Sequence, residues 1–258
     1  MSKVYLVGAG PGAPDLLTMR AARLLAEADI VFYDALVHPE TVALAVKATK
    51  TAVGKRAGQV STDQRFINRQ LVEAARHYQH VVRLKGGDPM IYGRAQEEIA
   101  ALKSAGIAFE VVPGITAALA ASASLGISLT RRGMARTVSF ATPRIGPNET
   151  ESDWLTAAAS ADSTILYMAA GQAPQIADAL MRAGKAADTP VAIVENASLE
   201  NEQRIFTTLA GLAVSSLKLT GPAVLCVGDV FAAESVSDGR VEHQSRMRQT
   251  HASRCQAG

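Results

Sequence analysis

The stretch VYLVGAGPGAPDLLTMRAARLLAEADIVFYDALV, residues 4–37, decides the fold. It begins with a short apolar run, Val4–Val7, and passes through a glycine-rich turn into the helical pattern of Thr18–Ala28. A second apolar run, Ile30–Tyr33, follows. Short β-type runs that alternate with helical stretches are the signature of an α/β chain. The stretch therefore predicts a strand–helix–strand unit with the glycine turn at the carboxyl end of its first strand.

The same alternation continues through the rest of the first half. Two further β-type runs lie at Val81–Leu84 and Phe109–Val112. The predicted helices of this half are Ile67–His77, Ala95–Ser104 and Ala117–Leu125. We expect the last of them, which is rich in alanine, to lead out of this half into a second one. The pattern predicts a first α/β domain over residues 1–117.

The second half has a different pattern, because several of its β-type runs are separated by turns too short to hold a helix. Such spacing predicts a mixed sheet rather than a purely parallel one. The predicted strands are Thr137–Ala141, Thr164–Met168, Val191–Val194, Gln203–Thr208 and Ala223–Val227. A helix is predicted at Gln175–Ala183 and a polar loop at Pro143–Ser152. We expect this α/β domain to span residues 118–233, followed by a disordered polar tail over 234–258.

The composition of the 258 residues is that of a globular chain, 48% hydrophobic and 19% charged. Lys and Arg total 26 against 24 Asp and Glu, and the resulting net charge of +2 argues against nucleic acid as a partner. No run approaches the roughly 18 apolar residues of a membrane span, and the start has no signal-peptide pattern. Cys226 lies in an apolar run and Cys255 in the polar tail, so neither a disulfide nor a metal pair is predicted. These observations predict a cytoplasmic protein with no nucleic-acid or membrane partner.

The glycine-rich turn, residues 8–15, directly follows the first predicted strand. In an α/β sheet, ligands bind beyond the carboxyl ends of the strands, where glycines let them approach the backbone. The glycines of this turn and Ala13 satisfy the loose dinucleotide pattern, which leaves a nicotinamide-dependent oxidoreductase open. Against this, Pro11 and Pro14 lack the N–H groups that would cradle a pyrophosphate. On its own, the turn also fits a tight strand-to-helix connection without a ligand.

Two more predicted strand ends carry glycine loops. The string KGGDP, residues 85–89, follows Val81–Leu84, and its Asp88 can accept hydrogen bonds from ligand hydroxyls or an ammonium group. The string PGITA, residues 113–117, places Thr116 at a helix start, where a threonine is by itself more typical of an N-cap. Three such loops in one half predict a ligand site at this edge of the sheet.

Six strings taken together carry a family resemblance. They are residues 4–37, VGKRAG at 53–58, VVRLKGGDPMIYGRAQEE at 81–98, FEVVPGITAALAA at 109–121, ILYMAA at 165–170 and GPAVLCVGDV at 221–230. In this order, and over about residues 3–232, the chain resembles the tetrapyrrole methylases. The strings GKRAG and RLKGGDP are more similar to the uroporphyrinogen-III C-methyltransferases of this family than to the later precorrin methylases.

The resemblance implies a two-domain α/β tetrapyrrole methylase fold, that of the class III methyltransferases, with the active site in the interdomain cleft of a homodimer. It implies S-adenosyl-L-methionine as cofactor, S-adenosyl-L-homocysteine as its product, and no metal. The implied reaction converts uroporphyrinogen III to precorrin-2 through precorrin-1, for siroheme or cobalamin biosynthesis. The implied cofactor contacts are Pro11, Gly86, Gly87, Asp88, Ile91, Thr116, Ala117, Met168 and Ala197. Without the family, Met168 would be interpreted as core packing.

The resemblance also implies the residues that act on the substrate, namely Asp34, Lys55, Arg94, Glu97 and Arg132. Asp34 follows a β-type run and could accept a proton at the sheet edge, although alone it also fits a cap of the next segment. Lys55 would be solvated charge in another protein, but beside a polycarboxylate it would bind carboxylates. Arg94 and Glu97 stand three apart on one helix face, an arrangement that is usually a surface ion pair.

The chain departs from the family pattern on the predicted substrate side. The usual THRD string reads TRRG at 130–133, which puts Arg131 and Gly133 at two altered positions. GRGGEE reads GRAQEE at 93–98, and TGH reads TPR at 142–144. Three alternatives stay open. They are another family member, such as a later precorrin methylase or a diphthine synthase, the nicotinamide-dependent oxidoreductase, and a tetrapyrrole-binding protein without turnover.

Overall fold

The computed structural model describes residues 2–53, 64–146 and 152–232. The chain forms two compact units. The first comprises the chain up to Ala120 together with Ser198–Glu200, and the second comprises Ala121–Ala197 and the chain from Asn201 onward. Lys55 and the tail predicted from residue 234 lie outside the described residues.

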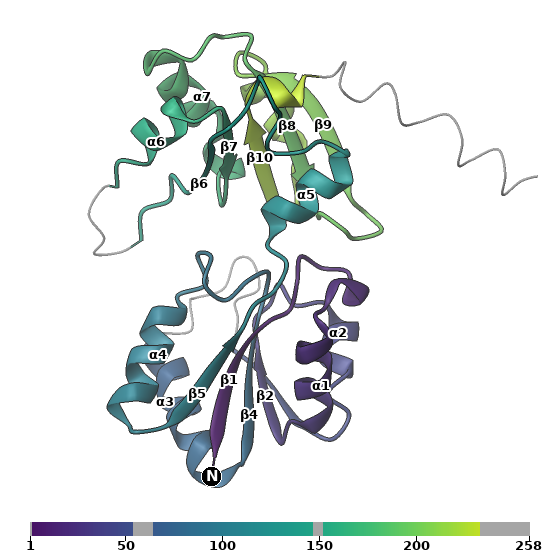
Figure 1. Cartoon of the computed structure of the whole chain (residues 1–258), viewed down its shortest axis with the longest axis vertical. Coiled ribbons are helices and arrows are strands. Elements are labelled where there is room, and N and C mark those ends of the chain that lie inside the picture. The colour runs from purple at the N-terminus through teal and green to yellow at the C-terminus, as the bar shows by residue number, and fades with distance from the viewer. Residues whose placement is uncertain (1, 54–63, 147–151, 233–258) are drawn as a thin grey trace, which may run out of the picture. The chain divides into compact units, whose positions relative to one another are not determined.

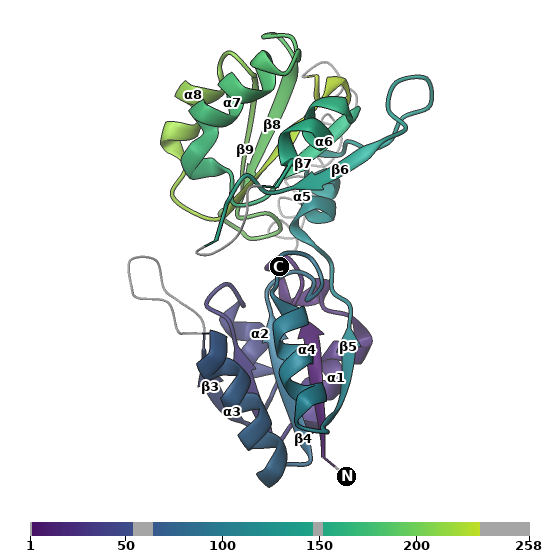
Figure 2. The same cartoon turned by 90° about the vertical axis from the view of Figure 1, so that its left-hand side faces the viewer.

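The first unit is built on a five-stranded sheet with the strand order β3-β2-β4-β1-β5 (Figure 1; β3 is labelled in Figure 2). Its strands are β1 (Lys3–Gly8), β2 (Ile30–Tyr33), β3 (Thr49–Ala52), β4 (His80–Lys85) and β5 (Ala108–Val112). All neighbouring strands run parallel, so their carboxyl ends lie along one edge of the sheet. Because β1 lies between β4 and β5, the loops that follow these three strands are neighbours.

Helices cover both faces of this sheet (Figure 1, Figure 2). On one face lie α1 (Met19–Glu27) and α2 (Pro39–Ala43), and on the other lie α3 (Gln64–His77) and α4 (Ala95–Ser104). Side chains alternate along β4, so that Val82 and Leu84 pack toward α1 while Val81 packs toward α3. By the same alternation Arg83 and Lys85 face α3 and α4.

The second unit contains a mixed sheet with the order β6-β7-β10-β8-β9. Its strands are β6 (Val138–Ala141), β7 (Ser163–Leu166), β8 (Pro190–Glu195), β9 (Gln203–Thr208) and β10 (Ala223–Val227). β6 is parallel to β7, whereas β10 is antiparallel to both of its neighbours, β7 and β8, and β9 is antiparallel to β8. The predicted mixed sheet is confirmed. Because β7 and β8 both oppose β10, they are parallel to each other and their carboxyl ends share an edge.

Helices pack on the second sheet around an apolar core. They are α6 (Trp154–Ser160), α7 (Ala173–Arg182) and α8 (Leu212–Ser215), and the chain enters the unit through α5 (Ala117–Leu125). Short 3₁₀ turns lie at Pro14–Leu16 in the first unit and at Ala170–Gln172, Ser216–Lys218 and Asp229–Phe231 in the second. Cys226 of β10 is fully buried, and burial raises the pKa of its thiol to about 12. The thiol therefore stays protonated and unreactive at neutral pH.

The predicted elements agree with most of the observed ones. The bounds are as predicted for β2, β9, β10, α4 and α5. The predicted strand Thr164–Met168 is too long, because β7 ends at Leu166 and Met168 has a φ of 53°, which is left-handed rather than extended. The sequence pattern does not predict β3, a polar edge strand with the sequence TKTA and no apolar run, or the short helices α2, α6 and α8.

Within residues 2–53, 64–146 and 152–232, no helix combines the length and the apolar character that crossing a membrane requires. In the same ranges no group of three or more His, Cys, Asp and Glu side chains is arranged to hold a metal ion.

Candidate active site

Three loops interlock at the carboxyl edge of the first sheet. Gly10, after β1, and Gly87, after β4, exchange backbone hydrogen bonds of 3.2 Å and 2.7 Å. The loop after β5 comes so close that a Cβ on Gly114 would lie 2.8 Å from the Cα of Gly8, and a Cβ on Gly8 would lie 2.6 Å from the Cα of Gly114. Only glycine fits on either side of this contact. We call Gly8, Gly10, Gly87 and Gly114 the glycine platform.

The Asp88 side chain ties two of these loops together. Its Oδ2 accepts a hydrogen bond of 2.9 Å from the N–H of Gly114, and its Oδ1 accepts one of 2.8 Å from the N–H of Met90. A carboxylate offers about four acceptor positions, so acceptor capacity remains for ligand hydroxyls or an ammonium group. Asp88 therefore shapes the platform and still presents oxygens beside it.

The other cofactor contacts predicted in this unit surround the platform. Pro11 and Gly86 are the sequence neighbours of its two bridged glycines. Ile91 closes the KGGDP turn through an N–H donated at 3.3 Å to the carbonyl of the aspartate. Ala117 begins α5, and the carbonyl of the preceding Thr116 accepts the N–H groups of Leu119 and Ala120. The structure thus brings these residues to one sheet edge.

The glycine turn after β1 leaves few backbone N–H groups for an anion. Those of Ala9, Gly10 and Ala13 all donate to protein acceptors, at 2.7 to 3.2 Å. Pro11 and Pro14 have no N–H at all. A pyrophosphate is bound by several free N–H groups, so this turn does not fit the nicotinamide-dependent alternative.

Asp34 lies directly after β2, at the same carboxyl edge. Its N–H donates to the Leu84 carbonyl at 3.3 Å, and its Oδ1 accepts a hydrogen bond of 2.5 Å from Arg83 Nη2. The Asp34 side chain is 28% exposed, whereas that of Arg83 is 2% exposed. The Asp34 carboxylate is therefore partly exposed at the sheet edge, and one of its oxygens is bonded by the buried Arg83 guanidinium.

Arg83 belongs to a set of buried charged groups beneath this edge. Glu98 of α4 is fully buried and accepts from Arg83 Nε at 2.9 Å and from Lys85 Nζ at 3.0 Å to each oxygen. Gln64 donates to the same carboxylate at 3.2 Å. We call Asp34, Arg83, Lys85 and Glu98 the buried charge cluster.

Burial and neighbouring charges shift the two cations of the cluster in different directions. Burial by itself lowers the pKa of Arg83. The carboxylates of Asp34 and Glu98 raise it by more, so the pKa of Arg83 lies above its ordinary value. Burial and the charge of Arg83 together lower the pKa of Lys85, against a smaller opposing effect of Glu98. Arg83 is therefore the permanent cation of the cluster.

In the second unit, Met168 and Ala197 follow β7 and β8, whose carboxyl ends share an edge. Met168 and Asn196 have φ values of 53° and 52°, conformations that cost a non-glycine residue of the order of 1–3 kcal/mol. Beside them, Glu195 Oε1 accepts two backbone N–H groups of the loop before β10, whereas its buried Oε2 has no partner among the described residues. Left-handed non-glycine residues just after β7 and β8 mark this edge as a candidate ligand site.

The predicted substrate residues lie on both units. Arg94 and Glu97 form a bidentate ion pair, in which Nε donates to Oε1 at 2.7 Å and Nη2 donates to Oε2 at 2.8 Å. Both side chains are about half exposed. Arg132 is exposed in a tight turn that begins at Arg131. Gly133 of this turn has a φ of 78°, which favours glycine and gives the departure from THRD a backbone reason.

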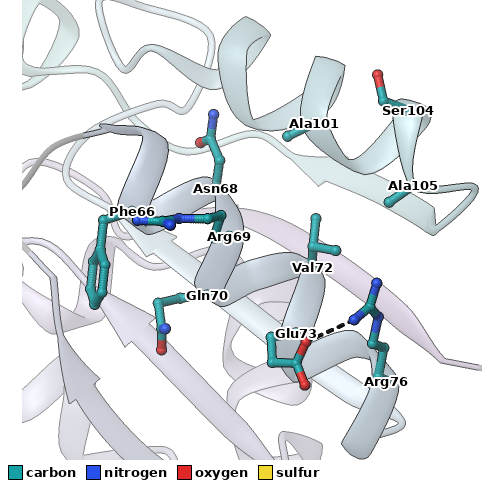
Figure 3. A pocket seen from close by; sticks show the side chains of 10 residues that line it. All are labelled: Phe66, Asn68, Arg69, Gln70, Val72, Glu73, Arg76, Ala101, Ser104 and Ala105. Atoms are coloured by element: carbon teal, nitrogen blue, oxygen red, sulfur yellow. Dashed lines mark hydrogen bonds and ion pairs between the residues drawn. The ribbon is translucent and has the colours of Figure 1, made fainter.

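A groove of about 690 Å³ lies on the outer side of α3 and α4 (Figure 3). The close-up shows Phe66 and the ion pair of Arg76 with Glu73, 3.0 Å long, among the side chains that line it. None of the predicted site residues is among them. This groove is therefore not part of the candidate active site.

Of the buried charge cluster, only Asp34 was predicted from the sequence as a site residue. A signal for the cluster is present, because Arg83 and Lys85 lie two apart in the run VVRLK and must share one face of a strand. Buried cations need a carboxylate opposite them. The string GRAQEE supplies two acids, Glu97 and Glu98, and only the packing of α4 decides that the second one is buried.

Known proteins resemble the chain over most of its length. The family model of the Tetrapyrrole (Corrin/Porphyrin) Methylases matches residues 3–213. A siroheme synthase of Pseudomonas putida is 46% identical over 232 residues, and one of Chromobacterium violaceum is 45% identical over 230 residues. Both matches cover 88% of this chain but only 50% and 49% of those proteins. The chain thus spans about half the length of the curated relatives it matches.

Two solved structures resemble the chain over nearly their whole length. The uroporphyrin-III C-methyl transferase of Thermus thermophilus, complexed with S-adenyl homocysteine, has a TM-score of 0.79 and 39% identity, and the match covers 89% of this chain and 98% of that one. A cobalt precorrin-4 methyltransferase from cobalamin biosynthesis has a TM-score of 0.77 and 29% identity, with coverages of 89% and 95%.

Proposed function

Because the chain belongs to the tetrapyrrole (corrin/porphyrin) methylase family, we propose that it is an S-adenosylmethionine-dependent C-methyltransferase acting on uroporphyrinogen III. It adds two methyl groups in succession and forms precorrin-2 through precorrin-1, the branch that leads to siroheme and cobalamin. One observation carries the proposal. The glycine platform, Asp88 and Asp34 lie at one sheet edge in a chain 39% identical to the uroporphyrin-III C-methyl transferase of Thermus thermophilus.

The proposed cofactor contacts are Pro11, Gly86, Gly87, Asp88, Ile91, Thr116, Ala117, Met168 and Ala197. The platform suits a nucleoside linked to an amino acid, because it offers bare backbone and has the acceptors of Asp88 beside it. When bound, S-adenosylmethionine supplies a methyl group on a sulfonium sulfur together with its leaving group.

The residues of the chain orient the substrate and move a proton. An electron-rich pyrrole carbon attacks the methyl group, so the protein contributes mainly positioning and electrostatics. Asp34 then accepts the proton that leaves as the ring rearranges. Arg94 and Arg132 bind carboxylates of the macrocycle, with Glu97 holding the Arg94 guanidinium in place. Lys55 is proposed as a further carboxylate contact.

Replacing Asp88 with alanine is expected to weaken the binding of S-adenosylhomocysteine by about 1–3 kcal/mol, because the Gly114 and Met90 N–H groups lose their acceptor. Isothermal titration of the variant and the wild type measures this difference. Asp178→Ala, on the exposed side of α7, is the matched control and should bind like the wild type. An Asp88→Ala protein with unchanged affinity would exclude the KGGDP loop from the cofactor site.

Incubation with uroporphyrinogen III and S-adenosylmethionine tests the proposed reaction. Mass and absorbance analysis should find products that are one and two methyl groups heavier than the substrate. The likeness to a cobalt precorrin-4 methyltransferase and the changes at Arg131 and Gln96 favour a later precorrin methylase as second candidate. That candidate predicts no methylation of uroporphyrinogen III and turnover of a later precorrin.

A homodimeric state and a cytoplasmic location complete the proposal. The family resemblance supports the dimer. The buried, unpaired Cys226 thiol is typical of a reducing compartment and supports the location. Sedimentation equilibrium measures the mass of the assembly, and a monomer would overturn that part of the proposal.

A further inference from the structure

The buried charge cluster is balanced in formal charge but costly to bury. It holds two cations, Arg83 and Lys85, and two carboxylates, Asp34 and Glu98. Buried ion pairs lose hydration on folding, and their replacement by apolar residues of similar volume is often neutral or stabilising. Stability alone therefore gives a weak reason for this cluster.

The members of the cluster differ in exposure, and the most exposed one lies at the candidate active site. The side chains of Arg83, Lys85 and Glu98 are 0 to 3% exposed, whereas that of Asp34 is 28% exposed. Asp34 is thus the member of the cluster that a substrate can reach. The other three are buried where β4 faces α3 and α4, because Arg83 and Lys85 of β4 contact Glu98 of α4, which also bonds Gln64 of α3.

The Arg83 guanidinium links the exposed carboxylate to the buried one. Its Nη2 donates to Asp34 at 2.5 Å, its Nε to Glu98 at 2.9 Å and its Nη1 to the Leu84 carbonyl at 3.2 Å. With three donors engaged and the side chain buried, the guanidinium plane has one orientation. Lys85 bonds both oxygens of Glu98 and fixes that carboxylate in turn.

We propose that Arg83, braced by Glu98 and Lys85, is a positioning residue that fixes the Asp34 carboxylate in the orientation needed to accept the substrate proton. This inference rests on the proposed function, in which Asp34 is the base. Arg83, Lys85 and Glu98 contribute to the reaction through Asp34, and none of them touches the substrate.

A double-mutant cycle with Asp34→Asn tests this dependence. In the otherwise unchanged chain, Arg83→Met should lower kcat for uroporphyrinogen III by about 10- to 100-fold, the effect of misplacing a reacting group, with KM near wild type. In the Asp34→Asn background, Arg83→Met should cause no further loss in single turnovers with labelled cofactor. Arg83→Lys keeps the positive charge but lacks the planar, multiple-donor geometry of the guanidinium, so it should recover only part of kcat. Equal fold losses in both backgrounds would overturn the inference.

Two further variants separate positioning from stability. Arg76→Met removes the arginine of an exposed ion pair on α3, seen in Figure 3, and should leave kcat unchanged. Arg83→Met combined with Glu98→Gln removes one buried charge of each sign, so it should unfold near the wild-type temperature while kcat stays low. A double variant that regains wild-type kcat would show that Arg83 acts on stability alone.

The inference and the proposed function can fail separately. If Asp34→Asn is impaired but Arg83→Met is fully active, only the inference fails. If Asp34→Asn keeps wild-type kcat, the assignment of the base fails, and the inference fails with it. Crystal structures test the inference without turnover. The Asp34 side chain should hold one conformer in the wild type and several in Arg83→Met, and a single unchanged conformer in the variant would overturn the inference.

Discussion

Asp34→Asn is expected to lower kcat for methyl transfer to uroporphyrinogen III by about 100- to 10,000-fold, the usual contribution of a general base. Asparagine keeps the shape of the side chain and can still accept a hydrogen bond from Arg83, but it cannot take up a proton in the reaction. Binding of S-adenosylhomocysteine should stay near wild type, because the glycine platform is untouched. Single-turnover transfer of a labelled methyl group measures the loss.

Asp178→Asn makes the same chemical change on the exposed side of α7 and should have wild-type kcat. A loss of activity in both variants would point to a general effect of the substitution. Wild-type kcat in Asp34→Asn would move the base to another residue.

Gly114→Ala is expected to lower the free energy of unfolding of the first unit by about 3 kcal/mol, the upper part of the usual range for overpacking. The new Cβ would lie 2.8 Å from the Cα of Gly8 and closer still to the Gly87 carbonyl oxygen. Both neighbours are backbone, so no flexible side chain can move aside. Because the loops must separate, binding of S-adenosylhomocysteine should also be lost. Urea denaturation monitored by circular dichroism measures the free energy of unfolding. Titration with S-adenosylhomocysteine measures the loss of binding.

Gly171→Ala is the matched control, because a Cβ at Gly171 meets no atom within 4 Å and its φ is not in the left-handed region. Its stability and affinity should equal those of the wild type. A Gly114→Ala protein that behaves like this control would show that the loops after β1, β4 and β5 have room to separate.

Much of the fold and part of the site could be predicted from sequence. Residues 4–37 and the glycine loops at 85–89 and 113–117 predict parallel strands with a ligand edge, and the structure places these loops together. The tetrapyrrole methylase fold class is confirmed by the solved relatives. The roles of the site residues stay predictions, and Lys55 lies outside the described residues.

Most of the elements and the loops that follow them can be predicted from the sequence, because apolar runs, helical periodicity and glycines act over a few residues. The position of β1 between β4 and β5, which brings Gly8 and Gly114 into contact, is visible only in the folded chain. The fold also joins Arg83 to Asp34 and Glu98, which are 49 and 15 residues away along the chain. A buried charge must find a partner, but the packing of sheet against helix, not a local pattern, selects which partner that is.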